Sequence, residues 1–340
     1  MEARPAPATL DNTSACLARA WHAVALAADL GAAPLRVQLL GEPWVITRLS
    51  GELTAFPDRC PHRLAPLSLG TVCGDTLQCR YHGWRFDAGG QCVEIPALGP
   101  DAALPPRAAL HPAAGVAERY GLLWLAPLPP VAPLPVFPEW DDDGFVNAMN
   151  DPRVTTAGAL QLVDNFLDAT HLPTVHLGTF GVADAPYVPP STVERDGWMS
   201  TSTFEVMYRN HDDPLVASGQ HPLVQPQELV KQICGPTTAL VRLRFPLTGK
   251  TVTFLFACAP NTGTATAVFK LMARDDLTDP PSQLPDLLKF EDRVLDEDLA
   301  VLEPYDAMTL AIDLGLEVHT RADRLSVTYR RLLAELAATA

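Results

Sequence analysis

The sequence predicts an α+β protein of two domains, in which a small all-β domain precedes a larger domain with an antiparallel sheet and C-terminal helices. Three observations support this fold class. The chain has 340 residues, more than one domain usually contains. Short strand patterns fill its first third, and a later run of strand patterns gives way to helical patterns only near the end. With 47% apolar residues, the chain can bury a sizeable core.

The expected division is an N-terminal arm over residues 1–20, the β-domain over 21–125, a linker over 126–138 and the second domain over 139–340. Proline is dense in the linker, where it excludes both a helix and a central strand. A turn signal at 87–90 predicts a hairpin. Runs bounded by glycine and proline predict the other strands of the β-domain, at 35–40, 44–49, 77–79 and 120–125.

The second domain changes from strand to helix patterns along its length. Two long stretches, 284–303 and 321–337, predict helices that end the chain. The segments 178–200 and 209–238 contain proline, glycine and histidine without a regular pattern, so we expect loops there. Alternating apolar residues predict the strands of one antiparallel sheet, at 201–208, 239–245, 252–257 and 266–273.

The charge balance argues against several classes of partner. A formal net charge of −15 disfavours nucleic acid and anionic membranes, since both require basic surface. The apolar run 23–28 is too short to cross a bilayer, and we find no signal-peptide pattern. Seven cysteines without regular pairing are typical of a reducing compartment, so we expect a cytoplasmic protein.

Two short loops carry the first metal motif. Cys60 and His62 form a Cys-x-His pair, and after a gap of sixteen residues Cys79 and His82 form a Cys-x-x-His pair. Two thiolates and two imidazoles can hold a [2Fe–2S] cluster, with the cysteines on one iron and the histidines on the other, which is a Rieske centre. Zinc accepts the same ligand set and is the alternative, although zinc-finger spacing would pair cysteine with cysteine and histidine with histidine.

A second metal motif lies in the larger domain. It contains His171 and His176, with Asp168 three residues before the first histidine. A helix that continues to Thr170 would put Asp168 and His171 on one face, and Pro173 would then break or kink it. Two imidazoles and one carboxylate, with the other coordination positions open, suit Fe(II) and O2 chemistry. One more ligand is therefore required.

The acidic run 291–298 offers this ligand. Apolar residues lie one turn before and one turn after Asp298, which places it on the apolar stripe of the predicted helix. An ionised carboxylate that faces a core is costly unless it is paired or bound to a metal. Asp298 is therefore the expected iron ligand. Asp292 and Asp296 have charged neighbours on the helix and are the alternatives.

The two motifs together resemble the Rieske non-haem iron oxygenases over nearly the whole chain. The runs Cys-Pro-His-Arg from Cys60 and Cys-Arg-Tyr-His-Gly-Trp from Cys79 are similar to the cluster loops of that family. The spacing from Asn165 to His176 is similar to the family's Asn-x-x-Asp-x-x-His-x4-His pattern. The helix that bears Asp298 resembles the vanillate and dicamba O-demethylase branch. The resemblance implies a Rieske domain followed by a helix-grip catalytic domain of the Bet v1/START type.

The same resemblance implies the cofactors and the roles of further residues. A Rieske [2Fe–2S] cluster, a mononuclear Fe(II) and O2 as cosubstrate are expected. Asp168 would bridge His171 at the iron and His82 of the cluster in a neighbouring subunit, and the physical reason is that a carboxylate orients an imidazole ligand. Asn165 would face the iron pocket. Members of the family are trimers, so the chain is expected to form a homotrimer.

Electrons are expected to come from a separate protein. The sequence has no Gly-x-Gly-x-x-Gly stretch for a nicotinamide or flavin cofactor. The family uses a ferredoxin or an NAD(P)H-dependent reductase that contains FMN and a [2Fe–2S] cluster. The arginines beside the cluster ligands either attract such an acidic partner or have structural roles, and the sequence leaves both open. They are Arg59, Arg63, Arg80 and Arg85.

The expected reaction is a monooxygenation of a small organic substrate, by hydroxylation of a C–H bond or by oxidative O- or N-demethylation. A ring cis-dihydroxylating dioxygenase is one alternative, and a Rieske electron-transfer protein without oxygenase activity is another. Aromatic and aliphatic residues at strand spacing suggest an apolar pocket for an aromatic or heterocyclic substrate. The candidate wall residues are Phe166, Phe204, Val206, Leu243, Phe245, Phe254, Phe256 and Phe269.

Overall fold

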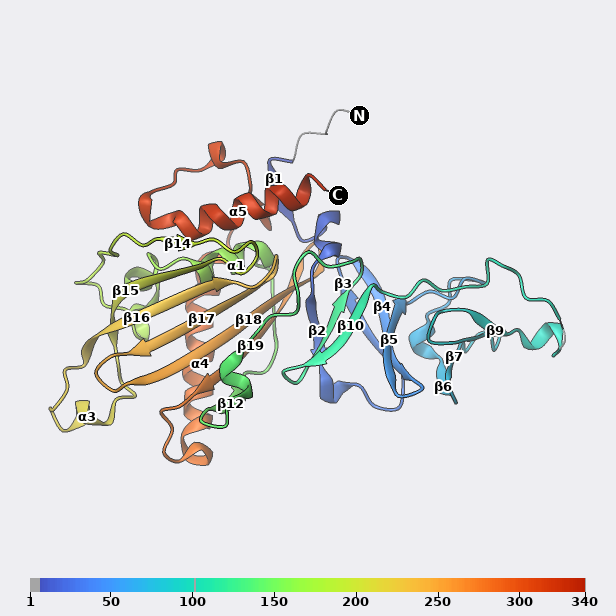
Figure 1. The fold of residues 1–340 in the computed structure, drawn as a ribbon, viewed down its shortest axis with the longest axis horizontal. Helices are drawn as coiled ribbons and strands as arrows, with labels where there is room; N and C mark the ends of the chain where they lie inside the picture. The colour runs from blue at the N-terminus through green and yellow to red at the C-terminus, as the bar shows by residue number, and fades with distance from the viewer. Residues whose placement is uncertain (1–6, 101, 340) are drawn as a thin grey trace. The chain divides into compact units, whose positions relative to one another are not determined.

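The computed structural model describes residues 7–100 and 102–339, and it divides into two compact units (Figure 1). The smaller unit is Ala18–Val131. The larger unit contains the described residues up to Leu17 together with those from Ala132 onward. The chain passes from one unit to the other within the proline-rich segment.

The smaller unit is built of antiparallel strands and short 3-10 helices. Its strands pair in the orders β3-β4-β5, β10-β11-β2 and β6-β7-β8-β9. The strands are β2 His22–Leu26, β3 Leu35–Leu39, β4 Glu42–Leu49, β5 Glu52–Pro57, β6 Thr71–Cys73, β7 Thr76–Gln78, β8 Arg85–Phe86, β9 Cys92–Glu94, β10 Gly115–Arg119 and β11 Leu122–Ala126. The 3-10 helices that it contains are η2 Ala27–Asp29, η3 Leu67–Leu69 and η4 Pro96–Leu98.

The predicted hairpin at 87–90 joins β8 and β9. The N–H of Gly90 donates to the carbonyl of Asp87 at 2.9 Å, and Gly90 has a φ of +82°. A Cβ at this position would lie 2.4 Å from the carbonyl oxygen of Leu110. Only glycine fits, because the backbone is both left-handed and closely packed. The hairpin closes the sheet that carries the second cluster loop, which lies between β7 and β8.

The larger unit contains one large antiparallel sheet, in the order β12-β19-β18-β17-β16-β15-β14, with β13 also paired to β19. Its strands are β12 Val146–Met149, β13 Arg153–Thr155, β14 Val193–Glu194, β15 Thr201–Arg209, β16 Val224–Ile233, β17 Thr238–Phe245, β18 Lys250–Thr262 and β19 Ala265–Arg274. Its helices are α1 Ala159–Leu167, α2 Leu172–Val175, α3 Pro214–Ala217, α4 Pro280–Leu302 and α5 Arg324–Ala337, and η5 Pro138–Asp141, η6 His176–Gly178, η7 Leu314–Leu316 and η8 Arg321–Asp323 are 3-10 helices.

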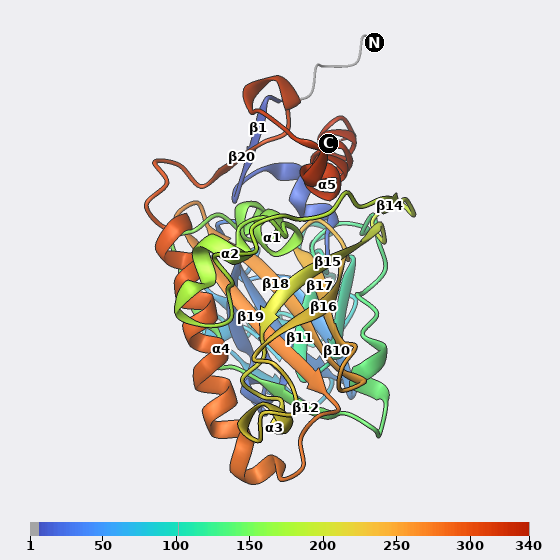
Figure 2. The same ribbon diagram turned by 90° about the vertical axis from the view of Figure 1, so that its left-hand side faces the viewer.

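One face of this sheet is covered by helices. Helix α1 packs on β16, β17 and β18, and α4 contacts α1, α2 and η6 (Figure 2). The buried residues of α4 include Leu295, Asp298 and Leu302, at helical spacing on one side. This arrangement encloses a space between α4 and the sheet. No helix within residues 7–100 and 102–339 combines the length and apolar composition needed to cross a bilayer.

Two segments differ from the sequence-based expectation. Thr9–Asp11, inside the expected N-terminal arm, form β1, which pairs with β20 (Thr309–Ala311) in the larger unit. The expected loop 209–238 contains the ten-residue strand β16. Pro226 obscured this strand in the sequence, because proline cannot donate to a ladder. Its position is solvent-exposed, its neighbours Gln225 and Gln227 pair with β15, and the ladder with β17 begins only at Glu228.

A buried ion pair joins α1 to α5. The guanidinium of Arg330 binds both carboxylate oxygens of Asp164, at 2.5 and 2.9 Å, and also binds Glu317 at 2.9 Å. Burial raises the pKa of Asp164, and Arg330 opposes this rise. The carboxylate therefore depends on the guanidinium to remain ionised inside the fold.

We predict that Arg330→Met lowers the free energy of unfolding of the larger unit by about 3–5 kcal/mol, because it leaves the carboxylate of Asp164 buried without a partner. The matched control is Arg331→Met, at an exposed position on the same helix, which should change stability by less than about 0.5 kcal/mol. Urea denaturation of both variants measures the difference. Equal stabilities of the two variants would contradict the prediction.

Candidate iron centres

The two cluster loops have the same local geometry. In the first loop the carbonyl of Cys60 accepts a hydrogen bond from the N–H of Leu64, and in the second the carbonyl of Cys79 accepts one from Gly83, at 2.9 and 3.0 Å. Leu64 and Gly83 both have a positive φ, of +58° and +72°. Each loop therefore turns back just after its ligand pair.

The loops bring the two predicted cysteine ligands close to each other and the two predicted histidine ligands close to each other. Cys60 and Cys79 are 2% and 1% exposed and belong to the core of the smaller unit. The Nδ1 atoms of His62 and His82 lie 3.1 Å apart at the surface, and the ring of His62 stacks on Trp84 with a centroid separation of 4.6 Å. Two buried thiols and two converging, more exposed imidazoles match the donor set of a Rieske cluster.

Burial raises the pKa of the Cys60 thiol to about 12, and the neighbouring Cys79 contributes in the same direction. A metal centre in these loops must therefore displace a firmly held proton, as thiolate ligation requires. All seven cysteines of the chain are free of disulfides, which is compatible with thiolate ligation by this pair.

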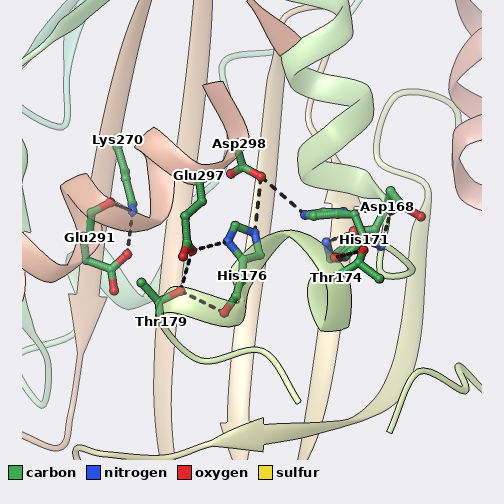
Figure 3. A network of polar contacts seen from close by, with 10 residues as sticks. Asp168, His171, Thr174, His176, Thr179, Lys270, Glu291, Glu297 and Asp298 are labelled. Atoms are coloured by element: carbon green, nitrogen blue, oxygen red, sulfur yellow. Dashed lines mark hydrogen bonds and ion pairs between the residues drawn. The ribbon is translucent and has the colours of Figure 1, made fainter. Parts of the chain in front are cut away.

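The second predicted site brings three side chains of the larger unit together (Figure 3). The Nε2 atoms of His171 and His176 lie 3.5 and 3.3 Å from Oδ1 of Asp298. The ligand atoms of these three residues all lie within 4.8 Å of one another. His171 precedes α2, His176 begins η6 and Asp298 lies on α4, so three separate elements form the site.

Asp298 has the environment of a metal ligand. It is 4% exposed, and its Oδ1 accepts no hydrogen bond within residues 7–100 and 102–339. Burial raises the pKa of Asp298, but His176 and His171 more than offset this effect, so the pKa lies below its ordinary value. A buried, ionised and unpartnered oxygen between two imidazoles fits a cation with two nitrogen ligands and one carboxylate.

A carboxylate binds the Nδ1 atom of each imidazole, on the side of the ring away from Asp298, and so orients the ring. Oδ2 of Asp168 accepts from Nδ1 of His171 at 2.8 Å, and Oε2 of Glu297 accepts from Nδ1 of His176 at 3.0 Å (Figure 3). With the proton held on Nδ1, each Nε2 presents its lone pair toward Asp298. Sequence reasoning missed this role of Glu297, although its position directly before Asp298 was a usable signal.

The position of Glu297 depends on the loop after His176. Its Oε2 also accepts a hydrogen bond from Oγ1 of Thr179 at 2.6 Å. A Cβ at Gly178 would lie 2.4 Å from Oε1 of Glu297, so glycine permits the close approach of the carboxylate. The hydrogen bonds of Glu297 to His176 and Thr179 therefore join helix α4 to η6 and the residue after it.

The predicted helix through Thr170 is wrong. Helix α1 ends at Leu167, and Asp168 has an extended backbone with φ −79° and ψ 141°. The carboxylate of Asp168 accepts hydrogen bonds from the backbone N–H groups of Thr170 and His171, at 3.0 and 2.9 Å, and this local bonding replaces the helical turn. Pro173 lies in the first turn of α2, where proline is tolerated, and does not kink a longer helix.

The alternative ligands lie elsewhere. Asp292 accepts a hydrogen bond from Asn150 at 2.9 Å, and Asp296 binds Arg153 at 2.8 Å on the exposed side of α4. The structure brings Asp298, and neither of these residues, to the two imidazoles. Asn165 lies on α1 near enough to Asp298 to lower the pKa of that carboxyl group, and its buried Nδ2 has no geometrically regular hydrogen bond among the described residues.

The three residues form part of the wall of a cavity between α4 and the large sheet. Phe166, Leu243, Phe254 and Phe256 line it, as predicted. Phe204, Val206, Phe245 and Phe269 do not. Phe269 alternates with the lining residue Lys270 on β19 and so points to the other face. The lining residues are Phe166, His171, Leu172, His176, Phe180, Tyr208, Gln227, Leu229, Lys231, Val241, Leu243, Phe254, Phe256, Lys270, Phe290, Glu291, Val294 and Asp298.

Comparison with known proteins identifies the family of the chain. Residues 20–117 match the Rieske [2Fe-2S] domain family, and residues 155–339 match the vanillate O-demethylase oxygenase C-terminal domain family. The chain belongs to the Rieske non-haem iron oxygenases. The predicted family and fold class of this Rieske oxygenase are thus confirmed.

Some relatives of this Rieske oxygenase are similar over most of its length and others over about half of it. Methylxanthine N1-demethylase NdmA from Pseudomonas putida is 32% identical over 93% of this chain and 88% of its own. The dicamba O-demethylase oxygenase component from Stenotrophomonas maltophilia is 36% identical over 46% of this chain and 47% of its own. The structure of NdmA with caffeine superposes with a TM-score of 0.79 at 27% identity, covering 97% of this chain and 96% of that one.

Family membership gives this Rieske oxygenase its cofactors. The chain uses a Rieske [2Fe–2S] cluster and a mononuclear iron, and it is a monooxygenase that acts with O2. The cofactor prediction is confirmed by the family match, and the zinc alternative is set aside.

We predict that Asp298→Asn lowers the affinity of the larger unit for mononuclear iron by at least about tenfold, since the anionic ligand is lost. The matched control is Asp296→Asn, which removes an exposed carboxylate from another face of the same helix and should retain iron. Total iron per chain and the visible absorption of the cluster measure both effects. Equal iron content in the two variants would contradict the prediction.

Proposed function

We propose that this Rieske oxygenase is the oxygenase component of a demethylase that removes a methyl group from a small aromatic or heterocyclic compound. The observation that carries the proposal is the location of His171, His176 and Asp298 in the wall of a largely apolar cavity. Such a cavity admits an apolar ring and holds a methyl group near the metal ligands. The relatives named as methylxanthine N1-demethylase and dicamba O-demethylase support this choice over ring cis-dihydroxylation.

Each predicted residue has a role in this proposal. His171, His176 and Asp298 hold the mononuclear iron, and the four cluster-loop residues hold the [2Fe–2S] centre, namely Cys60, His62, Cys79 and His82. When bound, the iron supplies O2 activation and the cluster supplies electrons. Oxygen insertion into an N- or O-methyl group gives a hemiaminal or hemiacetal, which then loses formaldehyde.

The protein contributes orientation and exclusion of water. Asp168 and Glu297 hold the imidazoles of His171 and His176 with Nε2 toward the metal position. The rings of His176 and Phe180 stack with a centroid separation of 4.6 Å, which further restrains His176. Phe166 and Phe256 stack at 4.0 Å and keep this side of the cavity dry. Asn165, which lowers the pKa of Asp298, is proposed to face the same centre.

Asp168 is proposed to connect the two iron centres between subunits. Its side chain is 21% exposed and, besides contacting His171, it lines a surface hollow together with Asn165 and Tyr305. His82 is exposed in the smaller unit. A homotrimer in which His82 of one copy reaches Asp168 of the next would give electrons a short hydrogen-bonded route to His171.

The electron donor is proposed to be a ferredoxin or an NAD(P)H-dependent reductase with FMN and [2Fe–2S] centres, in the same cytoplasmic compartment. Arg59 and Arg85 have structural partners, Glu42 and Glu94. Arg63 and Arg80 are exposed and form no ion pair among the residues that the structure describes. They are therefore the basic groups available to an acidic partner.

Turnover of a compound library tests the proposed activity. We expect the wild-type chain, with a reductase and O2, to yield formaldehyde and a product lighter by one CH2 group. His171→Ala should lose turnover by at least about 100-fold while the cluster is still reduced, since only the iron ligand is removed. A variant that retained full activity would show that His171 is not a ligand. A product with two added hydroxyl groups would support ring cis-dihydroxylation instead.

Charge reversal tests the docking surface. We predict that Arg63→Glu slows cluster reduction by about tenfold at low salt and weakens its dependence on ionic strength, because attraction to the donor is lost. Arg48→Glu is the control, since Arg48 lies on β4 and binds Glu118. Stopped-flow reduction at several salt concentrations measures the rates. Identical salt dependence in wild type and Arg63→Glu would remove Arg63 from the docking surface.

A further inference from the structure

The cavity beside the metal ligands is not uniformly apolar. Besides the three metal ligands, its lining includes the polar side chains of Tyr208, Gln227, Lys231, Lys270 and Glu291. Buried polar groups are normally hydrogen-bonded, so each of them requires a partner. The polar groups that lack a hydrogen-bond partner indicate what kind of substrate the cavity can accept.

The charged groups are already satisfied. Nζ of Lys270 donates to Oε2 of Glu291 at 2.5 Å and to the backbone carbonyl of Glu291 at 2.9 Å (Figure 3). The side chains of this pair are 3% and 10% exposed. Nζ of Lys231 donates to the carbonyl of Asp168, and the charges of Asp168 and Asp298 lie close to it. The ammonium of Lys270 is therefore paired with a carboxylate, and that of Lys231 is held by a backbone carbonyl near two carboxylates.

The neutral groups are not satisfied. Gln227 is 2% exposed, its Nε2 is buried without a hydrogen-bond partner, and its Oε1 accepts no hydrogen bond within the described chain. Gln227 shares one face of β16 with the other lining residues Leu229 and Lys231, at alternating positions. A buried amide without partners is costly to the fold, and a bound molecule can supply both partners.

Tyr208 adds a second neutral donor. Its ring lies between Phe180 and Phe245, with centroid separations of 4.9 and 5.4 Å, so the ring is held in place. Its hydroxyl makes no hydrogen bond to any residue that the structure describes. Burial raises the pKa of Tyr208 well above its ordinary value, so the hydroxyl keeps its proton. The aromatic stack continues from Tyr208 through Phe180 to His176.

We propose that Gln227 and Tyr208 are specificity-determining residues that bind the carbonyl and N–H groups of an uncharged amide or lactam on the substrate. The amide of Gln227 offers one donor face and one acceptor face, which complement an amide edge. A carboxylate substrate is disfavoured, because it would enter a low-dielectric space beside the carboxylates of Glu291 and Asp298, where Lys270 is already paired with Glu291. This inference rests on the proposed function and names the substrate class.

A matched series of methoxyarenes tests the inference by binding rather than by turnover. The probes are 2-methoxybenzamide, 2-methoxybenzoate and 2-methoxytoluene, which differ only in one ring substituent. Titration calorimetry on the anaerobic, iron-loaded wild-type chain should rank the benzamide at least about tenfold tighter than the benzoate. A benzoate that binds as tightly as the benzamide, or no binding by any probe, overturns the inference.

Two variants assign the effect to the named residues. Gln227→Leu should weaken benzamide binding by about tenfold and leave 2-methoxytoluene unchanged or tighter, and Tyr208→Phe, which keeps the aromatic stack, should also weaken the benzamide selectively. The control is Gln232→Leu on the same strand, whose side chain binds the carbonyl of Met199 instead. Equal losses for all three probes in both Gln227→Leu and Tyr208→Phe would indicate packing damage and overturn the assignment.

The outcomes separate this inference from the proposed function. If the benzamide binds selectively but releases no formaldehyde with reductase and O2, the demethylase proposal fails and the recognition of an amide stands. If formaldehyde is released but the benzoate binds more tightly than the benzamide, the recognition of an amide is contradicted and the demethylase proposal stands.

Discussion

The candidate iron site of the larger unit is organised around one buried carboxylate oxygen, Oδ1 of Asp298. Oδ1 of Asp298 is buried and lies 3.5 and 3.3 Å from the Nε2 atoms of two imidazoles, and among the described residues it accepts no hydrogen bond. An ionised oxygen in such a place is unfavourable for folding unless a cation compensates it. The carboxylates of Asp168 and Glu297 then fix the two imidazoles so that nitrogen lone pairs, rather than N–H groups, face this oxygen. The site is thus arranged for a cation and is poorly arranged for anything else.

The features that sequence could predict have short, regular geometry. The cluster loops place their ligands two and three residues apart, so no distant contact is needed to bring each pair together. Asp298 was predicted because α4 is a regular helix and its 3.6-residue period separates the buried stripe from the exposed one. The same period assigned Asp292 and Asp296 to the other faces, where the structure shows hydrogen bonds to Asn150 and Arg153. Local periodicity was sufficient wherever the local structure was regular.

The features that sequence could not predict depend on competition between local and distant contacts. Asp168 lies outside the helix because its side chain accepts hydrogen bonds from backbone N–H groups just after it. Helical spacing does not reveal whether these N–H groups bond to a side chain or to helical carbonyls. Strand β16 was missed because Pro226 interrupts its pattern, and with it the lining residues Gln227 and Lys231. Half of the predicted cavity walls were wrong for two reasons. Phe269 lies on the other face of β19, whereas Phe204, Val206 and Phe245 share a strand face with lining residues but do not border the cavity, and alternation does not show how far along a strand a cavity extends.

Helix α4 connects recognition and catalysis. Glu291, Val294 and Asp298 are spaced three and four residues apart, so one stripe of the helix carries the partner of Lys270, an apolar wall and a candidate metal ligand. Glu297, one position before Asp298, points instead toward His176. A displacement of α4 would therefore move the cavity wall, the anionic ligand and the orientation of one imidazole together.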